Sequence, residues 1–329
     1  MKDTELVEKL VEGRKSIIQQ LKKVIIGQDN VINELLIALF ARGHCMIVGV
    51  PGLAKTLLVS TLSDILNLEF KRIQFTPDLM PSDITGTEVI EQDPVSGKRN
   101  YRFIKGPIFA NIILADEINR TPPKTQSALL QAMQEYKVTV AGQTYPVPLP
   151  FFVLSTQNPI ELEGTYPLPE AQLDRFFFQI NIDYPSKEEE KEIVFSTTGV
   201  AEKDLEKVLN AQEIIRLQEI VRKVPVTENV VNYALNIVRS SRQKEPTAPD
   251  FVKSWVNWGA GPRASQTLIL AGKAKAIIDG RFTVSIDDVR AVAHSTLRHR
   301  ILLNFHAESE GITSDEVIKR LLGIVPTNA

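Results

Sequence analysis

Cysteine, tryptophan and histidine are all scarce in this chain of 329 residues. The single cysteine, Cys45, excludes an intrachain disulfide and a cysteine-built metal site, and it suits a reducing compartment. The four histidines lie at scattered positions without metal-ligand spacing. A large charge of either sign is also missing, since 38 Lys and Arg face 40 Asp and Glu, for a net charge of −2. That balance gives no electrostatic case for general binding to nucleic acid or to an anionic membrane.

The sequence also lacks an apolar segment suited to a membrane. The long uncharged stretch at 141–160 contains Pro146, Pro148, Pro150 and Pro159, which a spanning helix would not tolerate. The N-terminal residues are charged and lead into an amphipathic pattern, not into the apolar core of a secretory signal. We therefore expect a cytoplasmic protein with no membrane insertion.

The pattern along the chain changes near Pro185. Before it, short apolar runs alternate with helical patterns, whereas mostly helical patterns follow it. Ser186 and Glu189 have the spacing of a capping box, which marks the start of a helix. We predict an α/β domain over residues 1–184 and an all-α domain over residues 185–329.

Five short apolar runs in the first part are predicted to be strands. Most of them lack alternation between polar and apolar residues, which is typical of parallel strands covered on both faces. The run at 70–74 carries Lys71 and Arg72 and is the expected edge strand. The five runs are 44–48, 70–74, 112–115, 151–155 and 176–182. Together they predict a doubly wound sheet whose ligand crevice lies at the carboxyl ends of its strands.

Two further stretches are predicted to be hairpin insertions. Residues 88–103 have turn chemistry at 93–97 between two apolar-bearing arms. Residues 137–149 have Ala141 and Gly142 near a second turn. Insertions of this length within a compact domain usually have a function.

A glycine-rich segment follows the first predicted strand and precedes an amphipathic helix. In a phosphate-binding loop the backbone N–H groups surround phosphate oxygens, a lysine reaches the β- and γ-phosphates, and a hydroxyl binds Mg²⁺. Lys55 and Thr56 occupy the last two positions, but Ala54 stands where the general pattern has glycine. Alanine is tolerable at this position if its φ is negative, because its N–H then still points inward. The alternative is a plain Gly-Pro turn followed by an incidental lysine. The expected nucleotide-binding residues of this segment are Gly49, Val50, Pro51, Gly52, Leu53, Ala54, Lys55 and Thr56.

Two adjacent carboxylates end the predicted strand at 112–115. At the carboxyl end of a parallel strand, both Asp116 and Glu117 can face the crevice. Asp116 would join Thr56 in holding Mg²⁺, and Glu117 would polarise the attacking water. An ordinary polar turn at a strand end is the alternative, but the spacing from the glycine-rich segment favours a nucleotide site.

A third polar group, Asn158, follows the predicted strand at 151–155. It could hydrogen-bond the γ-phosphate or the attacking water from the same crevice. An Asn before Pro159 is otherwise a common turn residue.

The motifs described above, together with other segments of the chain, resemble the MoxR family of AAA+ ATPases. That family commonly has alanine before the lysine of its phosphate-binding loop. The resemblance extends from Ile26 to beyond Arg263, and its other segments are 75–83, 115–120, 168–176 and 259–265. It implies a P-loop AAA+ core with a parallel five-stranded sheet, flanking helices and two hairpin insertions, followed by an all-α lid. Such insertions place the family near magnesium-chelatase motor subunits and MCM-type helicases.

The resemblance also implies roles for individual residues. Glu117 would be the catalytic carboxylate and Asn158 the sensor on the third strand. Arg175 would reach the γ-phosphate of a neighbouring subunit, and Arg263 would be the sensor of the lid. The residues expected against adenine are Ile26, Gly27 and Gln28.

The two arginines can also be weighed physically. Arg263 follows Gly-Pro at an expected helix start, where the helix dipole disfavours a cation unless an anion is bound. Its alternative is an exposed arginine that extends into water. Arg175 follows Asp174, and a surface ion pair is the alternative for it. Arg120 remains a second choice for the arginine that acts on a neighbour.

The function expected from these motifs is Mg²⁺-dependent ATP hydrolysis in a ring of identical subunits, with six as the expected number. The resemblance implies chaperone-like maturation of a client, which in this family is often a von Willebrand factor A domain protein. A nucleotide-binding switch with little turnover is the first alternative, although a switch has no need of Glu117. A nucleic-acid motor is the second, suggested by the insertions and by Lys98, Arg99 and Arg102, but disfavoured by the net charge.

Overall fold

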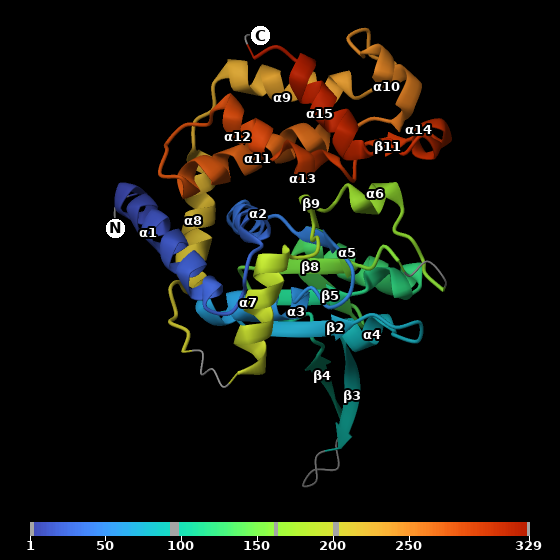
Figure 1. Ribbon diagram of the computed structural model, residues 1–329. Helices are drawn as coiled ribbons and strands as arrows, with labels where there is room; N and C mark the ends of the chain where they lie inside the picture. Colours follow the sequence, from blue (N-terminus) through green and yellow to red (C-terminus); the bar gives the residue numbers. More distant parts are fainter. Residues whose placement is uncertain (1–2, 93–98, 161–163, 200–203, 328–329) are drawn as a thin grey trace.

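The computed structural model describes residues 3–92, 99–160, 164–199 and 204–327. In Figure 1 the C-terminal helices lie on one side of the central sheet, the first helices of the chain lie beside both, and a β-hairpin projects away on the other side. Within the described residues, the model contains no helix with both the length and the apolar character needed to cross a bilayer.

The central sheet has five parallel strands in the order β2-β5-β8-β1-β9. All five predicted strands are therefore confirmed, and the predicted edge strand β2 does lie at an edge. The bounds of β2 match the prediction, and no end of the other strands differs from it by more than two residues. Polar residues extend β5 and β8 towards the crevice, whereas β9 is shorter than predicted. The strands are β1 (Cys45–Val48), β2 (Phe70–Gln74), β5 (Ile112–Asp116), β8 (Phe152–Gln157) and β9 (Phe178–Asn181).

The register of the sheet brings the functional strand ends together. Gln74 on β2 lies opposite Asp116 on β5, and Val48 on β1 lies opposite Gln157 on β8. Because all the strands run in one direction, their carboxyl ends form one edge of the sheet. The segments that follow β1, β5 and β8 therefore start beside one another.

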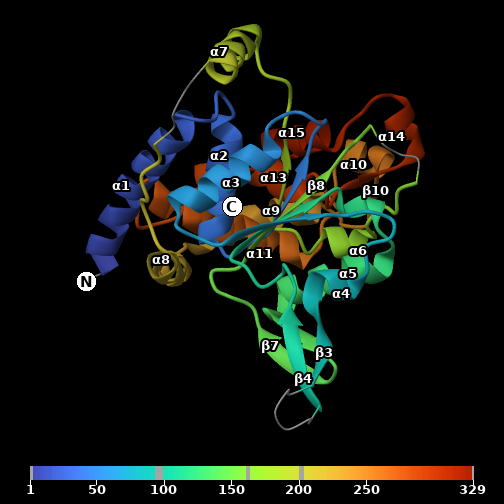
Figure 2. The same ribbon diagram turned by 90° about the horizontal axis from the view of Figure 1, so that it is seen from below.

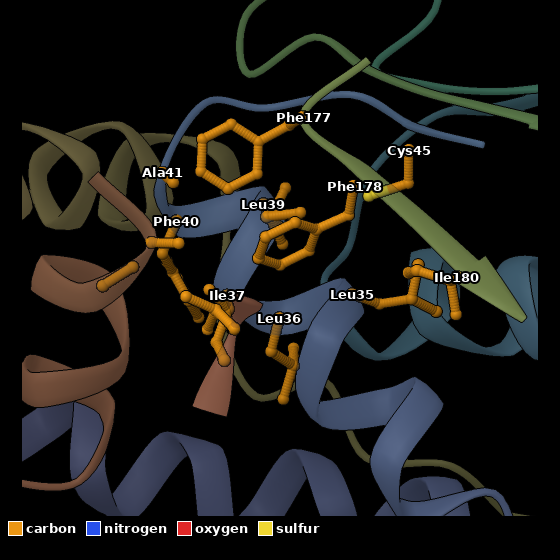
Figure 3. Close-up of a cluster of buried hydrophobic side chains, with 14 of the residues drawn as sticks. Leu35, Leu36, Ile37, Leu39, Phe40, Ala41, Cys45, Phe177, Phe178 and Ile180 are labelled. Carbon is orange, nitrogen blue, oxygen red and sulfur yellow. The ribbon is translucent and has the colours of Figure 1, made fainter. Parts of the chain in front are cut away.

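Helices pack against this sheet through apolar faces. In α2, the buried positions include Leu35 and Leu39, and Figure 3 shows Leu39 beside Phe178 and Leu35 beside Ile180, both on β9. Complete burial of a large apolar side chain stabilises the fold by about 1.5–3 kcal/mol. The helices of the first part are α1 (Asp3–Lys22), α2 (Asp29–Phe40), α3 (Lys55–Ile65), α4 (Pro81–Thr85), the 3₁₀ turn η1 (Ile118–Arg120), α5 (Pro123–Glu135) and α6 (Glu170–Leu173).

Both predicted hairpins are present and lie on the same side of the molecule (Figure 2). The first pairs β3 (Gly86–Gln92) with β4 (Arg99–Lys105), and the second pairs β6 (Lys137–Val140) with β7 (Gln143–Pro146). The rings of Phe103 and Tyr145 stack with centroids 4.2 Å apart, so the two hairpins contact each other near their bases. The turn predicted at 93–97 falls outside the described residues.

The C-terminal part is helical, as expected, apart from a short antiparallel ribbon of β10 (Val256–Trp258) and β11 (Leu302–Leu303). The predicted capping box of Ser186 and Glu189 is confirmed at the start of α7. The helices are α7 (Lys187–Thr198), α8 (Ala211–Lys223), α9 (Glu228–Ser240), α10 (Asp250–Trp255), α11 (Pro262–Ile278), α12 (Ile286–Ala291), α13 (Ala293–Leu297), α14 (Phe305–Ser309) and α15 (Ser314–Ile324).

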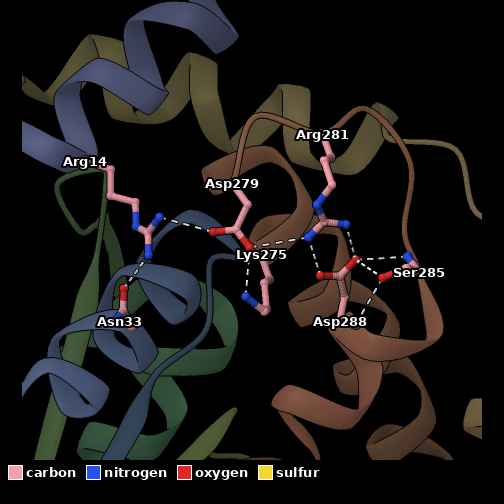
Figure 4. Close-up of polar contacts among 7 residues, drawn as sticks. All are labelled: Arg14, Asn33, Lys275, Asp279, Arg281, Ser285 and Asp288. Carbon is pink, nitrogen blue, oxygen red and sulfur yellow. Dashed lines mark hydrogen bonds and ion pairs between the residues drawn. The ribbon is translucent and has the colours of Figure 1, made fainter.

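The two parts of the chain share one buried apolar cluster. It includes side chains of α1, α2, β1 and β9 together with side chains of α8, α9 and α11. Polar contacts follow the same path, since Arg14 on α1 bonds both Asn33 on α2 and Asp279 just after α11 (Figure 4). The predicted boundary between residues 184 and 185 therefore divides the chain but not its core, and it stays a prediction.

Candidate functional site

The glycine-rich segment joins β1 to α3. The backbone N–H of Leu58 donates to the carbonyl of Ala54, which begins the helical bonding of α3. The Nζ of Lys55 donates to the carbonyl of Gly49 at 2.6 Å, so the lysine side chain folds back over the loop. The unpaired N–H groups of a helix start and a nearby lysine are the groups that bind phosphate.

The backbone of Ala54 does not meet the condition under which alanine is tolerated without strain. Its φ is +55°, in the left-handed region, and not negative. A left-handed conformation brings Cβ close to the following carbonyl, which costs roughly 1–2 kcal/mol for a residue other than glycine. The general preference for glycine at this position therefore does apply to this chain, and alanine is held there under strain.

The protonation of Lys55 reflects two opposing influences. Partial burial lowers the pKa of its ammonium group, whereas the charges of Asp116 and Glu117 raise it. The net shift is downward. A bound phosphate would add negative charge beside the ammonium group and favour its charged form.

The carboxylate of Asp116 lies at the end of β5 and is largely buried. It accepts a hydrogen bond from the hydroxyl of Thr156 on β8. Arg72 on β2 donates to the same carboxylate from Nε at 3.0 Å and from Nη2 at 2.6 Å. Three neighbouring strands therefore meet at this one side chain.

Glu117 follows directly and also has a left-handed backbone, with φ +56°. Its N–H donates to the hydroxyl of Thr156 at 2.8 Å. Its carboxylate accepts from the amide of Gln74 at 2.9 Å and from Arg120 at 3.1 Å. These bonds fix the direction of the Glu117 carboxylate.

Asn158 extends the site from the end of β8. Its side chain is 7% exposed, and its Oδ1 accepts from the N–H of Ile160 at 3.2 Å. Among the residues that the structure describes, no acceptor bonds the two side-chain N–H donors of Asn158. The expectation that a third strand brings a polar group to the same crevice is confirmed in position.

A pocket of about 430 Å³ unites these groups. Residues 51–57 form one wall, and Arg72, Asp116, Glu117, Thr156 and Asn158 form the rest. Thr56 and Asp116 offer a hydroxyl and a carboxylate on the same pocket, which is the sparse oxygen set that Mg²⁺ uses when phosphates and water complete its shell. The residues present therefore fit Mg²⁺. Among the described residues no group of three or more His, Cys, Asp and Glu could hold a metal by itself.

Two of the predicted arginines lie elsewhere. Arg175 and Arg263 both line a second pocket of about 340 Å³, together with Gly43 and His44 at the amino end of β1. Neither lines the phosphate pocket, which lies beyond the carboxyl end of the same strand. Arg263 forms an ion pair with Asp174 at 3.2 Å. Contact of Arg263 with a nucleotide in its own subunit thus has no support from this arrangement.

The residues expected against adenine lie beside the phosphate loop without lining its pocket. The amide of Gln28 donates to the carbonyl of Leu53 at 3.4 Å. Gly27 has a φ of +69°, in the left-handed region that favours glycine, and it lies close to the carboxylate of Glu189 on α7. The adenine role of Ile26, Gly27 and Gln28 stays a prediction.

The sequence analysis missed three residues that organise the site: Arg72, Gln74 and Thr156. Arg72 was used only as a sign of an edge strand. Its spacing of two from Gln74 puts both on one face of β2, at the end where the carboxylates were expected. That alternation, combined with a parallel register, was the available signal.

Comparisons with known proteins agree with this geometry. Residues 44–178 match the family model of the ATPases associated with various cellular activities (AAA), and residues 252–321 match the AAA lid domain. The chaperone MoxR1 of Mycobacterium tuberculosis is 46% identical over 94% of this chain and 80% of its own length. The Bacillus subtilis protein YeaC is 41% identical over 94% of this chain and 92% of its own length.

A solved structure gives the same result. The crystal structure of a "putative ATPase" from Cytophaga hutchinsonii superposes with a TM-score of 0.90 at 41% identity, covering 98% of this chain and 97% of that one. Protein MoxR of Methylorubrum extorquens is more distant, at 28% identity over 87% of this chain. From its phosphate loop, its paired carboxylates and these relatives, the chain belongs to the MoxR family of AAA+ ATPases.

Proposed function

We propose that this protein is a Mg²⁺-dependent ATPase that uses ATP hydrolysis to remodel or mature a client protein. The observation that carries this proposal is the convergence of Lys55, Thr56, Asp116, Glu117 and Asn158 on one pocket. Phosphoryl transfer depends on positioning and charge compensation, and these are the groups that supply both.

Each residue has a distinct task in this proposal. The loop N–H groups and Lys55 bind the β- and γ-phosphates, while Thr56 and Asp116 hold the metal. When bound, Mg²⁺ would neutralise charge on the phosphate oxygens. Glu117 accepts a proton from the attacking water, and the free N–H donors of Asn158 orient the γ-phosphate or that water.

The arginine needed for the transferred phosphoryl group comes from a neighbouring copy in this proposal. Arg175 and Arg263 lie together at the amino end of the sheet, away from the pocket of their own subunit. An arginine supplied by a neighbour can increase phosphoryl transfer by about 10³–10⁵. We therefore propose that subunits assemble into a ring, with six as the expected number, in which each subunit completes the next.

The client role rests on similarity alone. One relative is named a chaperone, and we propose a comparable role here, acting in the cytoplasm, where ATP is available. A von Willebrand factor A domain protein is the class of client that the family resemblance favours.

The test is ATP hydrolysis per chain with Mg²⁺, measured over a wide range of protein concentration. The proposal expects a specific rate that rises with concentration. Glu117→Gln should keep ATP binding and lower the rate by about 10²–10⁴-fold, because it removes the proton acceptor and little else. Glu135→Gln, at the exposed end of α5, is the matched control and should change neither.

Two results would count against the proposal. Tight ATP binding without hydrolysis at any concentration would favour a nucleotide switch. A rate that depends on Glu117 but not on protein concentration would contradict the arginine supplied by a neighbour.

A further inference from the structure

Arg300, three residues beyond α13, is a buried cation whose N–H groups all have partners. Its side chain is 2% exposed, yet it belongs to no part of the phosphate pocket. Its Nη2 donates to the carbonyl of Phe176 at 2.6 Å, and its Nη1 donates to the carbonyls of Phe177, at 3.3 Å, and Thr296. Its Nε donates to the carboxylate of Asp174 at 2.8 Å.

These bonds hold the backbone on both sides of Arg175. Nη2 also donates to the carbonyl of Asp174. Arg300 therefore bonds the backbone carbonyls of the residue before Arg175 and of the two residues after it. The segment contains no regular strand at this point, because β9 begins at Phe178. The N–H groups of Arg175 and Phe176 bond back to the carbonyls of Gln172 and Leu173, and Arg300 adds the bonds that tie this turn to the C-terminal part.

Asp174 links the same arginine to the lid sensor. One of its carboxylate oxygens accepts from Arg300 and the other accepts from Arg263 at 3.2 Å. Arg175, Arg263 and Arg300 all line the same pocket. One carboxylate and one buried arginine thus determine where two partly exposed arginines lie.

Stability alone is a weak reason for this arrangement. Burial lowers the pKa of Arg300 to about 10, opposed by the hydrogen bond and charge of Asp174, so the group remains a buried cation at neutral pH. Well-packed apolar residues often replace such a pair without loss of stability. Arg300 is buried while the Asp174 side chain is 32% exposed. The pair is better explained by the geometry that it imposes on its neighbours.

We propose that Arg300, acting through Asp174, is a positioning residue that sets Arg175 and Arg263 for the nucleotide of a neighbouring subunit. This inference rests on the proposed function, in which those two arginines act on the next subunit. Arg300 belongs to the C-terminal helical part and Asp174 to the sheet-bearing part. The positions of Arg175 and Arg263 therefore depend on how these two parts pack against each other.

Arg300→Lys is the first test, because lysine keeps the charge but its three N–H donors cannot bond all five oxygens that Arg300 reaches. Asp174→Asn is the second, since it leaves the carbonyl bonds of Arg300 in place and protects the test against a variant that fails to fold. We expect either change to lower kcat by about 10²-fold, the size of a displacement of about 1 Å at a reacting centre, with KM for ATP within about twofold.

Arg298→Lys is the matched control. Arg298 also joins the C-terminal part to the sheet, donating to the carbonyl of Gln179 at 3.2 Å, but it does not touch the segment around Arg175. Its replacement should leave kcat within about twofold of the unmodified protein, the same margin allowed for KM. Equal losses in Arg298→Lys and Arg300→Lys would overturn the proposal, as would unchanged kcat in Arg300→Lys and Asp174→Asn.

A mixing experiment separates positioning from a general structural effect. Glu117→Gln subunits keep intact arginines but cannot hydrolyse ATP, whereas Arg300→Lys subunits keep an intact phosphate pocket. We compare two mixtures, Glu117→Gln with Arg300→Lys and Glu117→Gln with Arg175→Ala. In both, the rate of ATP hydrolysis should exceed the sum of the rates of the two separate proteins, and by the same factor. A different response of the two variants would overturn the proposal.

Failure of the proposed ATPase function can be distinguished from failure of the positioning role of Arg300. If the unmodified protein does not hydrolyse ATP, the proposed function itself is wrong. If it does, and Arg175→Ala and Arg263→Ala are both fully active, the ATPase stands while the positioning role of Arg300 falls.

Discussion

Three residues around the phosphate loop have left-handed backbones although none is glycine. Gln28, Ala54 and Glu117 have φ values of +61°, +55° and +56°. Each such residue costs about 1–3 kcal/mol and persists only where its surroundings hold it. Ala54 and Glu117 line the phosphate pocket and Gln28 lies beside its loop, which indicates that the fold accepts local strain in order to aim particular N–H groups and side chains.

At Ala54 the strain can be measured directly. Ala54→Gly should raise the free energy of unfolding by about 0.5 kcal/mol, since relief of a cost of roughly 1–2 kcal/mol exceeds the greater entropy of glycine in the unfolded chain. Urea unfolding of both proteins is the measurement. Ala128→Gly, inside α5, is the control and should lower stability by up to about 1 kcal/mol. A loss of stability in Ala54→Gly would mean that the left-handed backbone carries no penalty.

Arg72 competes for the carboxylate that is expected to bind the metal. Its side chain is about half exposed, and such a pair is worth about 0.5–1 kcal/mol. Arg72→Gln should therefore lower the Mg²⁺ concentration for half-maximal ATP hydrolysis by about twofold to fivefold. Arg102→Gln, which removes an exposed pair with Glu91 on the hairpin, should leave it unchanged. A higher Mg²⁺ requirement in Arg72→Gln would show that Arg72 assists the metal or the phosphates.

At the scale of elements, the sequence predicts what is local and periodic. The ends of β2 and the cap of α7 follow directly from apolar runs and from the spacing of Ser186 and Glu189. The convergence of Lys55, Asp116 and Asn158 also follows, because parallel strands end at one edge. The bonds from Arg72 and Gln74 do not, since they depend on which strand lies beside β5 and in which register. The placement of Arg263 beside Asp174 likewise depends on how distant helices are seated.

His44, just before β1, makes the stability of the fold depend on pH. Burial lowers the pKa of His44 to about 4 from the ordinary 6.5, despite its bond to the carbonyl of Met133. Because the folded pKa lies below the unfolded value, the unfolded chain takes up a proton first as the pH falls. Stability is therefore lost between about pH 6.5 and pH 4, by about 1.4 kcal/mol for each unit.

His44→Gln, which does not titrate, should reduce this dependence. Between pH 7 and pH 5, urea unfolding of the variant should lose about 2 kcal/mol less than that of the unmodified protein. His299 is also buried with a lowered pKa and contributes in the same direction, so only the difference between the two proteins is informative. Identical pH dependence would contradict the assignment to His44.

At the scale of the molecule, α1 joins parts that are distant in sequence. It contacts α3 in the first part and α8 and α11 in the second, and its Ile17 side chain is fully buried in the shared cluster. Ile17→Ala should lower the free energy of unfolding by about 2–5 kcal/mol, whereas Ile17→Val should lower it by about 0.5–1.5 kcal/mol. Because the cluster is continuous, we expect one shifted transition in calorimetry. A second transition would indicate two cores that unfold separately.

The opposite placement of the phosphate pocket and the arginine pair limits the symmetry open to an assembly. The pocket lies past the carboxyl end of β1, and Arg175 and Arg263 lie by its amino end. A two-fold interface joins one patch to its own copy, so it cannot readily bring opposite ends of a strand into mutual contact. If the arginine pair of one copy contacts the phosphate pocket of the next, an open chain of copies always has one unfilled pocket and one unused arginine pair at its two ends. Only a closed ring fills every pocket, whereas a rotation that does not close produces an open helical filament.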